Sequence, residues 1–278
     1  MINKVHIVGL GMMGTNLALK LVNEGVQVSG EDLFSENLNR AKKLGAINSE
    51  YNQDATYDVV VLSMPISEII MFLDKEVNYK TKLIMDIGGT KDLICEKMNS
   101  LKIPSVGGHP LCGVADNKTW KPTPEIFVNS AFLLCETKSS NETSKQLATE
   151  LVKTIESKEI WIEPKKHDEL IALTSHFPHV LSSALVGIAM KQQNLTDIIE
   201  LASGGFDGAT RLSRTSPNMI SDMYLTNLNN VQALVKNLIL ELEKILEITD
   251  SNLMIDYLAQ TVDWRRALSE KFGERELS

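Results

Sequence analysis

Short apolar runs alternate with helical patterns over residues 1–163. An apolar run at 5–8 leads into a glycine-rich turn, an amphipathic pattern follows, and a second short run lies at 26–28. Further runs lie at 57–65, 82–89, 103–106, 131–135 and 159–162. Continuous hydrophobicity, as at 57–65, is typical of a strand buried on both faces of a parallel sheet. The alternation predicts an α/β fold with a Rossmann-type, doubly wound parallel sheet.

The pattern changes at residues 163–166, after which strand signals vanish and long helical patterns follow. Ser216 and Pro217 are typical of a helix start. In the helix expected to follow, an apolar seam repeats at spacings of three and four: Leu228, Val231, Val235, Leu238, Leu242 and Ile245. We therefore predict two domains, 1–163 and 164–278, the second an all-helical dimerisation domain.

Two interpretations of this seam are open. The seam could pack inside its own subunit, or it could form a homodimer interface. A helical domain of about 110 residues could hardly bury so many apolar positions alone, which favours the dimer.

The turn after the first apolar run holds Gly9, Gly11 and Gly14 at G-x-G-x-x-G spacing. Between a strand and a helix, such glycines permit a tight turn, close approach to a pyrophosphate and close helix–strand contact. The helix N-terminus presents free N–H groups to phosphate. Asp32 follows the second run, where a carboxylate accepts hydrogen bonds from a ribose 2′-OH and repels a 2′-phosphate.

This order of elements predicts a dinucleotide site that prefers NAD to NADP, against the alternative of a glycine-rich turn in another α/β protein. The expected cofactor-binding residues are Gly9, Gly11, Met12, Met13, Gly14, Asp32, Ser63 and Pro65.

The amino-acid composition limits the classes of binding partner that we expect. The 278 residues carry a formal net charge of −8, with a pI near 5.3. This acidic balance argues against a nucleic-acid or anionic-membrane partner. Three cysteines without metal-type spacing suit a reducing cytosol. We find no signal segment and no apolar stretch of the ~18 residues that a membrane span needs, so we expect a cytoplasmic protein.

His109 lies in the segment V-G-G-H-P-L-C-G, residues 106–113, after an expected strand. The neighbouring glycines let backbone approach a ligand, and Pro110 fixes the turn that aims the imidazole. An imidazole beside a hydride acceptor can take the proton of an alcohol as the hydride leaves. The alternative is a histidine that satisfies loop hydrogen bonds.

Three of the five histidines fall in residues 165–187, which we expect to be helical and bent at Pro178. On an ideal helix, His176 and His179 lie about 60° apart, and His167 lies about 180° from His176. Because no third ligand is well placed, we expect no metal site.

Residues 201–217 place paired glycines and Thr210 before Arg211, ahead of a helix start. The planar guanidinium of Arg211 suits bidentate pairing with a carboxylate. The alternative is a surface arginine or one half of an ion pair.

Four segments together resemble the prephenate dehydrogenase family, which includes arogenate dehydrogenases. They are GLGMMG, GGHPLCG, HDELIALTSHFPH and ASGGFDGATR, in order over about residues 4–227. The resemblance implies a Rossmann domain joined to a helical dimerisation domain. It also implies NAD(P)-dependent oxidative decarboxylation of prephenate to 4-hydroxyphenylpyruvate, or of arogenate to tyrosine.

The resemblance further implies that His109 contacts the ring hydroxyl and assists its deprotonation. Arg211 would pair with a substrate carboxylate, and His167 and His179 would line the same pocket. We assign His109, His179 and Arg211 as catalytic, and His167, His176, Gly204 and Thr90 as substrate-binding.

The chain departs from the family pattern at four places. Gly89 occupies the position of a serine in the D-x-[GA]-S-x-K turn, where the neighbouring Thr90 could supply a hydroxyl instead. Ala115, with Asp116 beside it, replaces a glutamate, Asp207 replaces the arginine of a GGF-Arg-Asp sequence, and Ile220 replaces a tryptophan. These changes leave substrate choice and tyrosine sensitivity open.

Prephenate is the expected substrate, ahead of arogenate. Three further readings stay open: an aminodeoxyprephenate dehydrogenase on the same scaffold, a non-catalytic NAD(H)-binding relative, and a 3-hydroxyacid dehydrogenase. The retention of both His109 and Arg211 argues against a mere sensor. The 3-hydroxyacid dehydrogenase alternative is disfavoured, because those enzymes use a catalytic lysine where this chain has histidines.

Overall fold

A computed structural model describes residues 2–75, 77–112 and 121–272. Gly113, Ala115 and Asp116, which the sequence analysis singled out, lie outside the described residues. The chain divides into two compact units, Met1–His176 with Thr215–Leu228, and Phe177–Arg214 with Asn229–Ser278. We call them unit 1 and unit 2 and describe each by itself.

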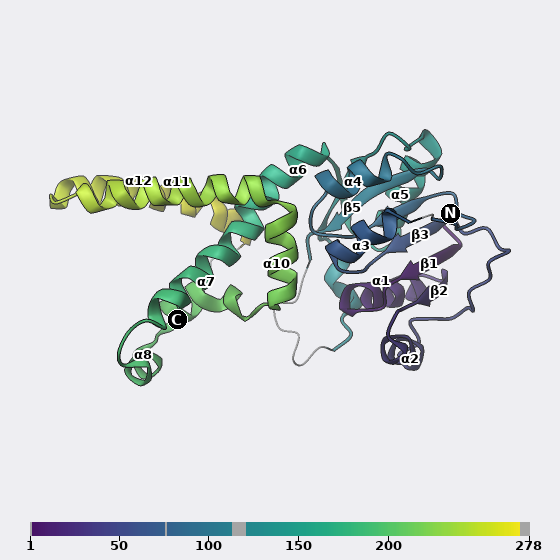
Figure 1. The fold of residues 1–278 in the computed structure, drawn as a ribbon, viewed down its shortest axis with the longest axis horizontal. Coiled ribbons are helices and arrows are strands. Elements are labelled where there is room, and N and C mark those ends of the chain that lie inside the picture. Colours follow the sequence, from purple (N-terminus) through teal and green to yellow (C-terminus); the bar gives the residue numbers. More distant parts are fainter. Residues whose placement is uncertain (1, 76, 113–120, 273–278) are drawn as a thin grey trace. The chain divides into compact units, whose positions relative to one another are not determined.

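Unit 1 is built on a seven-stranded sheet with the order β2-β1-β3-β4-β5-β6-β7 (Figure 1). Its strands are β1 (Lys4–Val8), β2 (Gln27–Glu31), β3 (Val59–Leu62), β4 (Ile84–Asp86), β5 (Ser105–Pro110), β6 (Ala131–Glu136) and β7 (Lys158–Trp161). Neighbouring strands are parallel except for β5 and β6, which are antiparallel. The predicted α/β fold is confirmed, with one antiparallel step in the sheet.

Helices cover both faces of this sheet. They are α1 (Met12–Asn23), α2 (Ser35–Lys43), α3 (Ile66–Leu73), α4 (Asp92–Met98) and α5 (Glu142–Thr154), with a 3₁₀ turn, η1 (Pro124–Phe127). One core cluster joins Ile7 of β1 to residues of α1 and α5, such as Leu17 and Leu151. A second joins Val60 of β3 to residues of α3 and α4, such as Ile69. Side chains alternate along each strand, so one sheet supplies both cores.

The strand order places a topological switch between β1 and β3. Strand β1 lies between β2 and β3, so the chain winds outward in one direction through β2 and in the other through β3 to β5. Open α/β sheets bind ligands in the crevice at the carboxyl ends of the strands at such a point. The loops that follow β1 and β3 therefore flank the expected cofactor site.

Two helical segments that follow residue 163 belong to unit 1 rather than to unit 2. The first is α6 (Pro164–Ile171) with the π-helical turn η2 (Ala172–His176), and the second contains α10 (Pro217–Thr226). Met223 of α10 is buried in the core beside α3, and the Ser67 Oγ donates to Asp222 Oδ2 at 2.9 Å. The compact units are thus divided differently from the predicted domains 1–163 and 164–278.

The prediction of one continuous helix after Pro217 was wrong, because the helix is interrupted at Asn227. Helix α10 ends at Thr226 and α11 begins at Leu228. Asn227 leaves helical geometry, with φ −127° and ψ 31°, and its buried amide donates to the Asp168 carbonyl at 2.8 Å. This tertiary hydrogen bond outweighs the helical preference that the sequence pattern indicated.

Unit 2 is helical. It holds α7 (Phe177–Ala189), α8 (Leu195–Leu201), α9 (Gly204–Thr210), the 3₁₀ turn η3 (Arg211–Arg214), α11 (Leu228–Glu247) and α12 (Ser251–Phe272). Its apolar side chains are largely uncovered. Of the predicted seam only Val231 is buried, and Leu242 is 49% exposed, while Leu246 and Ile255 elsewhere in the unit are 81% and 58% exposed. Within the described residues, this unit does not bury its own apolar surface.

One stretch of the described residues, Pro164–Ala189, is long and apolar enough by length and composition to cross a membrane. The expectation that no stretch qualifies was wrong by this measure. Its first turns are anchored in unit 1, where His167 and Asp168 are buried and hydrogen-bonded. Pro178 has no N–H to donate, and the chain forms a π turn immediately before α7.

Candidate active site

The glycine loop after β1 has the geometry that its spacing predicts. Gly9 has φ +96°, and a Cβ there would lie 2.7 Å from the Ser63 carbonyl oxygen. A Cβ at Gly14 would lie 2.0 Å from the Gly9 carbonyl oxygen, so only glycine allows α1 to approach the turn. At Gly11 a Cβ would meet no atom within 4 Å, which leaves space at the start of α1.

The N-terminus of α1 is available to an anion. Gly11 is its N-cap and makes no side-chain capping hydrogen bond, and the first turn, with Met12 and Met13, carries no acidic residue. Unpaired N–H groups and the positive end of the helix dipole favour a phosphate at such a point. These residues therefore fit the pyrophosphate of a dinucleotide.

Asp32 is tied to the glycine loop, which the sequence did not reveal. Its Oδ2 accepts the Leu10 N–H at 2.7 Å, and its Oδ1 accepts the Phe34 N–H at 2.8 Å and the Asn37 amide at 3.1 Å. A half-buried carboxylate held in this way fits a ribose diol. Its charge would repel a phosphate in place of the 2′-hydroxyl.

The loop after β3 supplies the remaining predicted cofactor residues. Ser63 packs against Gly9, and its buried Oγ makes no hydrogen bond to the part of the chain that the structure describes. Pro65 is exposed and precedes the first residue of α3. The unpaired hydroxyl and the exposed ring both border the switch point between β1 and β3.

His109 lies within β5 rather than after it, one residue before the strand ends. Its Nδ1 contacts the Nε2 of His167 at 2.9 Å. On its other side, a Cβ at Gly89 would lie 4.0 Å from the His109 Nε2, so the absent serine leaves room beside that nitrogen. Burial, followed by the charges of His167, Lys91 and His176, holds the pKa of His109 well below its usual range.

A buried ion pair is linked to the strand that carries His109. The Lys91 Nζ contacts the Asp86 Oδ2, and both side chains are fully buried. Asp86 also accepts the N–H groups of Gly88 at 2.7 Å and Gly108 at 3.2 Å. The carboxylate therefore joins the turn after β4 to the strand that carries His109. These two residues are the first and last of the D-x-[GA]-S-x-K turn, so the motif could have indicated them.

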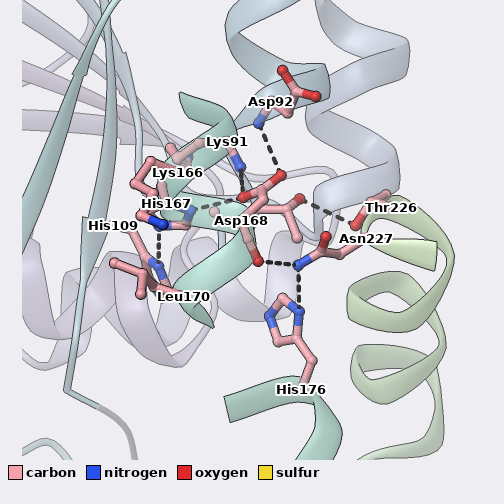
Figure 2. A network of polar contacts seen from close by, with 12 residues as sticks. Lys91, Asp92, His109, Lys166, His167, Asp168, Leu170, His176, Thr226 and Asn227 are labelled. Carbon is pink, nitrogen blue, oxygen red and sulfur yellow. Dashed lines mark hydrogen bonds and ion pairs between the residues drawn. The ribbon is translucent and has the colours of Figure 1, made fainter. Parts of the chain in front are cut away.

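His167 and Asp168 follow one another on α6 and are both buried (Figure 2). The Asp168 Oδ1 lies 2.7 Å from the His167 Nδ1. The same carboxylate accepts the N–H groups of Lys91 at 2.8 Å and Asp92 at 3.0 Å, in the first turn of α4. Asp168 was missed in the sequence, although its position directly after a histidine was a signal.

Two predicted substrate-binding residues are buried inside unit 1. His176 is 2% exposed, and its Nδ1 lies 3.2 Å from the Asn227 amide nitrogen. Thr90 is fully buried and its hydroxyl donates to the Thr226 Oγ1 at 3.1 Å. The Thr90 hydroxyl is therefore held by a threonine of the α10 segment, and its expected role in place of the missing serine stays a prediction.

The remaining predicted site residues lie in unit 2. His179 on α7 contacts the Leu212 carbonyl oxygen through its Nδ1 at 3.2 Å, and the Ser213 N–H donates to the Ser182 Oγ at 3.1 Å. Burial lowers the pKa of His179, and the positive charge of Arg211 lowers it further. Arg211 begins η3 and is exposed, and Gly204 opens α9. His179 and Arg211 thus lie close enough for the charge of Arg211 to act on His179, and their shared role at a substrate site stays a prediction.

Among the described residues no three histidine, cysteine or carboxylate side chains gather as a metal site would require. The chemistry that unit 1 offers is an imidazole with a lowered pKa beside a glycine, in a sheet with a dinucleotide-type turn. Unit 2 offers a guanidinium beside a second imidazole.

Comparisons with known proteins agree with this description. Residues 17–161 match the nucleotide-binding domain of prephenate dehydrogenase, and residues 163–263 match its dimerization domain. A prephenate dehydrogenase of Lactococcus lactis is 31% identical over 239 residues, which span 81% of this chain and 65% of that protein. A cyclohexadienyl dehydrogenase of Zymomonas mobilis is 25% identical over 282 residues, 95% of each.

A solved structure is similar over almost its whole length. It is the prephenate dehydrogenase of A. aeolicus in complex with hydroxyphenyl propionate and NAD+, with a TM-score of 0.84 and 26% identity. The similarity covers 96% of this chain and 99% of that one.

The fold and the site define a dinucleotide-binding α/β protein with a helical second domain and a histidine-centred site. The chain belongs to the prephenate dehydrogenase family. This confirms the family that the four segments indicated.

Proposed function

We propose that this protein catalyses the oxidative decarboxylation of prephenate to 4-hydroxyphenylpyruvate, with NAD+ as hydride acceptor. The observation that carries the proposal is His109, whose pKa is held well below its usual range and whose Nε2 lies beside Gly89, on the sheet that bears the dinucleotide turn. Membership of the family and the A. aeolicus complex with NAD+ support it.

In the proposed reaction, His109 takes the proton of the ring hydroxyl at its Nε2 while the hydrogen on the same ring carbon leaves as hydride. The bond from the ring to its carboxylate then breaks and releases CO₂. Its electron pair enters the ring, which becomes aromatic, and the proton returns from His109 to the oxygen. Aromaticity and loss of CO₂ drive the reaction, so the protein needs mainly orientation and one proton acceptor.

NAD+, when bound, supplies the hydride acceptor. Gly11 and the first turn of α1 would hold its pyrophosphate, and Asp32 its adenosine ribose, as their geometry allows. The fixed negative charge of Asp32 favours NAD over NADP.

Arg211 is proposed to bind a substrate carboxylate, with His179 beside it. His179 donates its Nδ1 hydrogen to the Leu212 carbonyl, which leaves its Nε2 as an acceptor. Gly204, Thr90 and His176 keep their expected place around the substrate as part of the same proposal, whereas both nitrogens of His167, the fourth residue predicted there, contact neighbouring side chains.

The nature of the substrate side chain is a separate question. The Lactococcus lactis relative is named for prephenate and the Zymomonas mobilis relative for cyclohexadienyl substrates. Prephenate has a keto group where arogenate has an amino group. We propose prephenate as the preferred substrate and arogenate as the alternative.

We propose that unit 2 associates with a second copy of the chain. The match of residues 163–263 to a dimerization domain and the exposed apolar side chains on α11 and α12, such as Leu242 and Ile255, support a homodimer. Cys95, Cys112 and Cys135 are all free, which suits the expected cytoplasm.

The test is NADH formation by the purified protein with NAD+ and prephenate, with arogenate in a parallel reaction and NADP+ in a third. We expect the fastest rate with prephenate and NAD+. A faster rate with arogenate would reassign the substrate. Silence with both substrates, together with measurable NAD+ binding, would favour the non-catalytic NAD(H)-binding alternative.

A further inference from the structure

His167 has no nitrogen left for a substrate. Its Nδ1 lies 2.7 Å from the Asp168 Oδ1, its Nε2 lies 2.9 Å from the His109 Nδ1, and the residue is fully buried (Figure 2). Three side chains therefore form a continuous row from Asp168 through His167 to His109. The row ends at the His109 Nε2, which lies beside Gly89.

Asp168 is the fixed end of this row. Its two carboxylate oxygens accept the N–H groups of Lys91 and Asp92 at the start of α4. Its backbone carbonyl accepts the Asn227 amide at 2.8 Å. The two N–H groups hold the carboxylate and the Asn227 amide holds the backbone, so the position of the carboxylate relative to His167 is set by the fold.

Each hydrogen bond in the row determines the next. A carboxylate can only accept, so the hydrogen between Asp168 and His167 sits on the His167 Nδ1. A neutral imidazole with a hydrogen on one nitrogen has a lone pair on the other, so the His167 Nε2 is an acceptor. The His109 Nδ1 must then carry a hydrogen, and the His109 Nε2 is left with the lone pair.

Both imidazoles meet the condition of neutrality. Burial is the largest cause acting on the pKa of His167 and of His109 and lowers both. The Asp168 hydrogen bond and the charges of Asp168 and Asp86 raise the pKa of His167, which is still lowered overall, and the charge of Lys91 lowers both. Near pH 7 each ring therefore carries a single hydrogen, and its place is decided by its hydrogen-bond partner.

We infer that Asp168 is a positioning residue which, through His167, fixes His109 in the tautomer that can accept the substrate proton at Nε2. This inference rests on the proposed function for the identity of the proton, and on the hydrogen-bond row for the tautomer. The inference changes the role assigned to His167, which now supports His109 instead of contacting the substrate. An aspartate that holds a catalytic histidine in one tautomer has a precedent in serine proteases.

The first test needs no substrate. The ring ¹⁵N chemical shifts of the protein labelled at histidine report which nitrogen carries the hydrogen, and a His109→Asn variant assigns the His109 signals. We expect hydrogen on Nδ1 of both His109 and His167. A hydrogen on the Nε2 of His109 would overturn the inference.

The second test removes the carboxylate. Asp168→Ala leaves His167 without an acceptor, so the tautomers of both histidines should mix and kcat should fall about 10²-fold, with little change in KM. Asp168→Asn keeps one acceptor oxygen but puts an amide NH2 where the second oxygen accepts the Asp92 N–H, so it should also lower kcat, as the corresponding change does in serine proteases through the wrong tautomer. Unchanged His109 tautomer and unchanged kcat in Asp168→Ala would overturn the inference.

Asp222→Ala is the matched control, because Asp222 also accepts hydrogen bonds at the start of a helix. Its Oδ2 accepts the Ser67 N–H at 3.3 Å and the Ser67 hydroxyl at 2.9 Å, and among the described residues it forms no hydrogen bond with a histidine. It should destabilise the protein as Asp168→Ala does, without changing the ring ¹⁵N shifts of His109. If both variants change those shifts equally, the effect is structural and the inference fails. If the protein shows the predicted tautomers but does not turn over prephenate, the hydrogen-bond row is supported and only the proposed function is overturned.

Discussion

Gly89 lies directly beside the Nε2 of His109. A Cβ built at Gly89 would be 4.0 Å from the His109 Nε2 and 3.8 Å from the Ile66 Cδ1, which are ordinary contact distances. A side chain of this size would fit without displacing backbone. The position where the sequence departs from its family therefore has room for a Cβ.

Gly89→Ser should restore a hydroxyl at this position. A serine Oγ could reach hydrogen-bond distance of the Nε2 and help to orient the ring and the substrate. We expect kcat/KM for prephenate to rise by about fivefold, which is the worth of one hydrogen bond of about 1 kcal/mol. Gly89→Ala is the control, since it adds the same Cβ without the hydroxyl. Equal kinetics for the two variants would contradict this account.

The pH dependence of kcat/KM follows from the depressed pKa of His109. The reaction needs the neutral ring, so activity is complete above the folded-state pKa and falls as pH drops through it. Burial, with the facing groups His167, Lys91 and His176, lowers that pKa well below its usual range. We expect the acid limb to lie below the ordinary histidine value of about 6.5. A limb at or above that value would show that His109 is not held neutral.

Arg211→Ala should raise the KM for prephenate by about tenfold or more, with a smaller effect on kcat, because a substrate carboxylate loses its charged partner. Arg214→Ala, on the same 3₁₀ turn, is the matched control. Steady-state kinetics at saturating NAD+ separate the two. An unchanged KM in Arg211→Ala would mean that another cation holds the carboxylate.

Lys91→Met should unfold the protein more readily. It leaves the Asp86 carboxylate fully buried without its cation, a change that typically costs about 3–5 kcal/mol of unfolding free energy. Lys166→Met is the control, because Lys166 pairs with Glu169 at 3.0 Å on the surface, where ion pairs contribute little. Chemical denaturation measures both. Similar midpoints for the two variants would contradict the structural role of the buried pair.

The parts of the site that obey local rules could be predicted from the sequence. Gly9 and Gly14 follow from the close approaches that a strand–turn–helix unit imposes, and Asp32 from its place after the second strand. The apolar runs gave the strands because both faces of a doubly wound sheet are buried. These features depend on neighbours near in sequence.

The parts that depend on contacts between distant segments could not be predicted. The break at Asn227 arises from a hydrogen bond to Asp168, 59 residues away in the chain. The partner of the Thr90 hydroxyl is Thr226, 136 residues away. No periodicity records such contacts, so Asp168 was passed over although it stands beside a histidine that was chosen.

The central claim is that His109 accepts the substrate proton in an NAD-dependent oxidation. The most direct measurement compares NADH formation from prephenate by the natural protein and by His109→Asn, with NAD+ affinity measured separately on both. We predict that kcat falls by about 10²-fold or more in the variant while NAD+ affinity is unchanged. Near-normal turnover in His109→Asn would contradict the account.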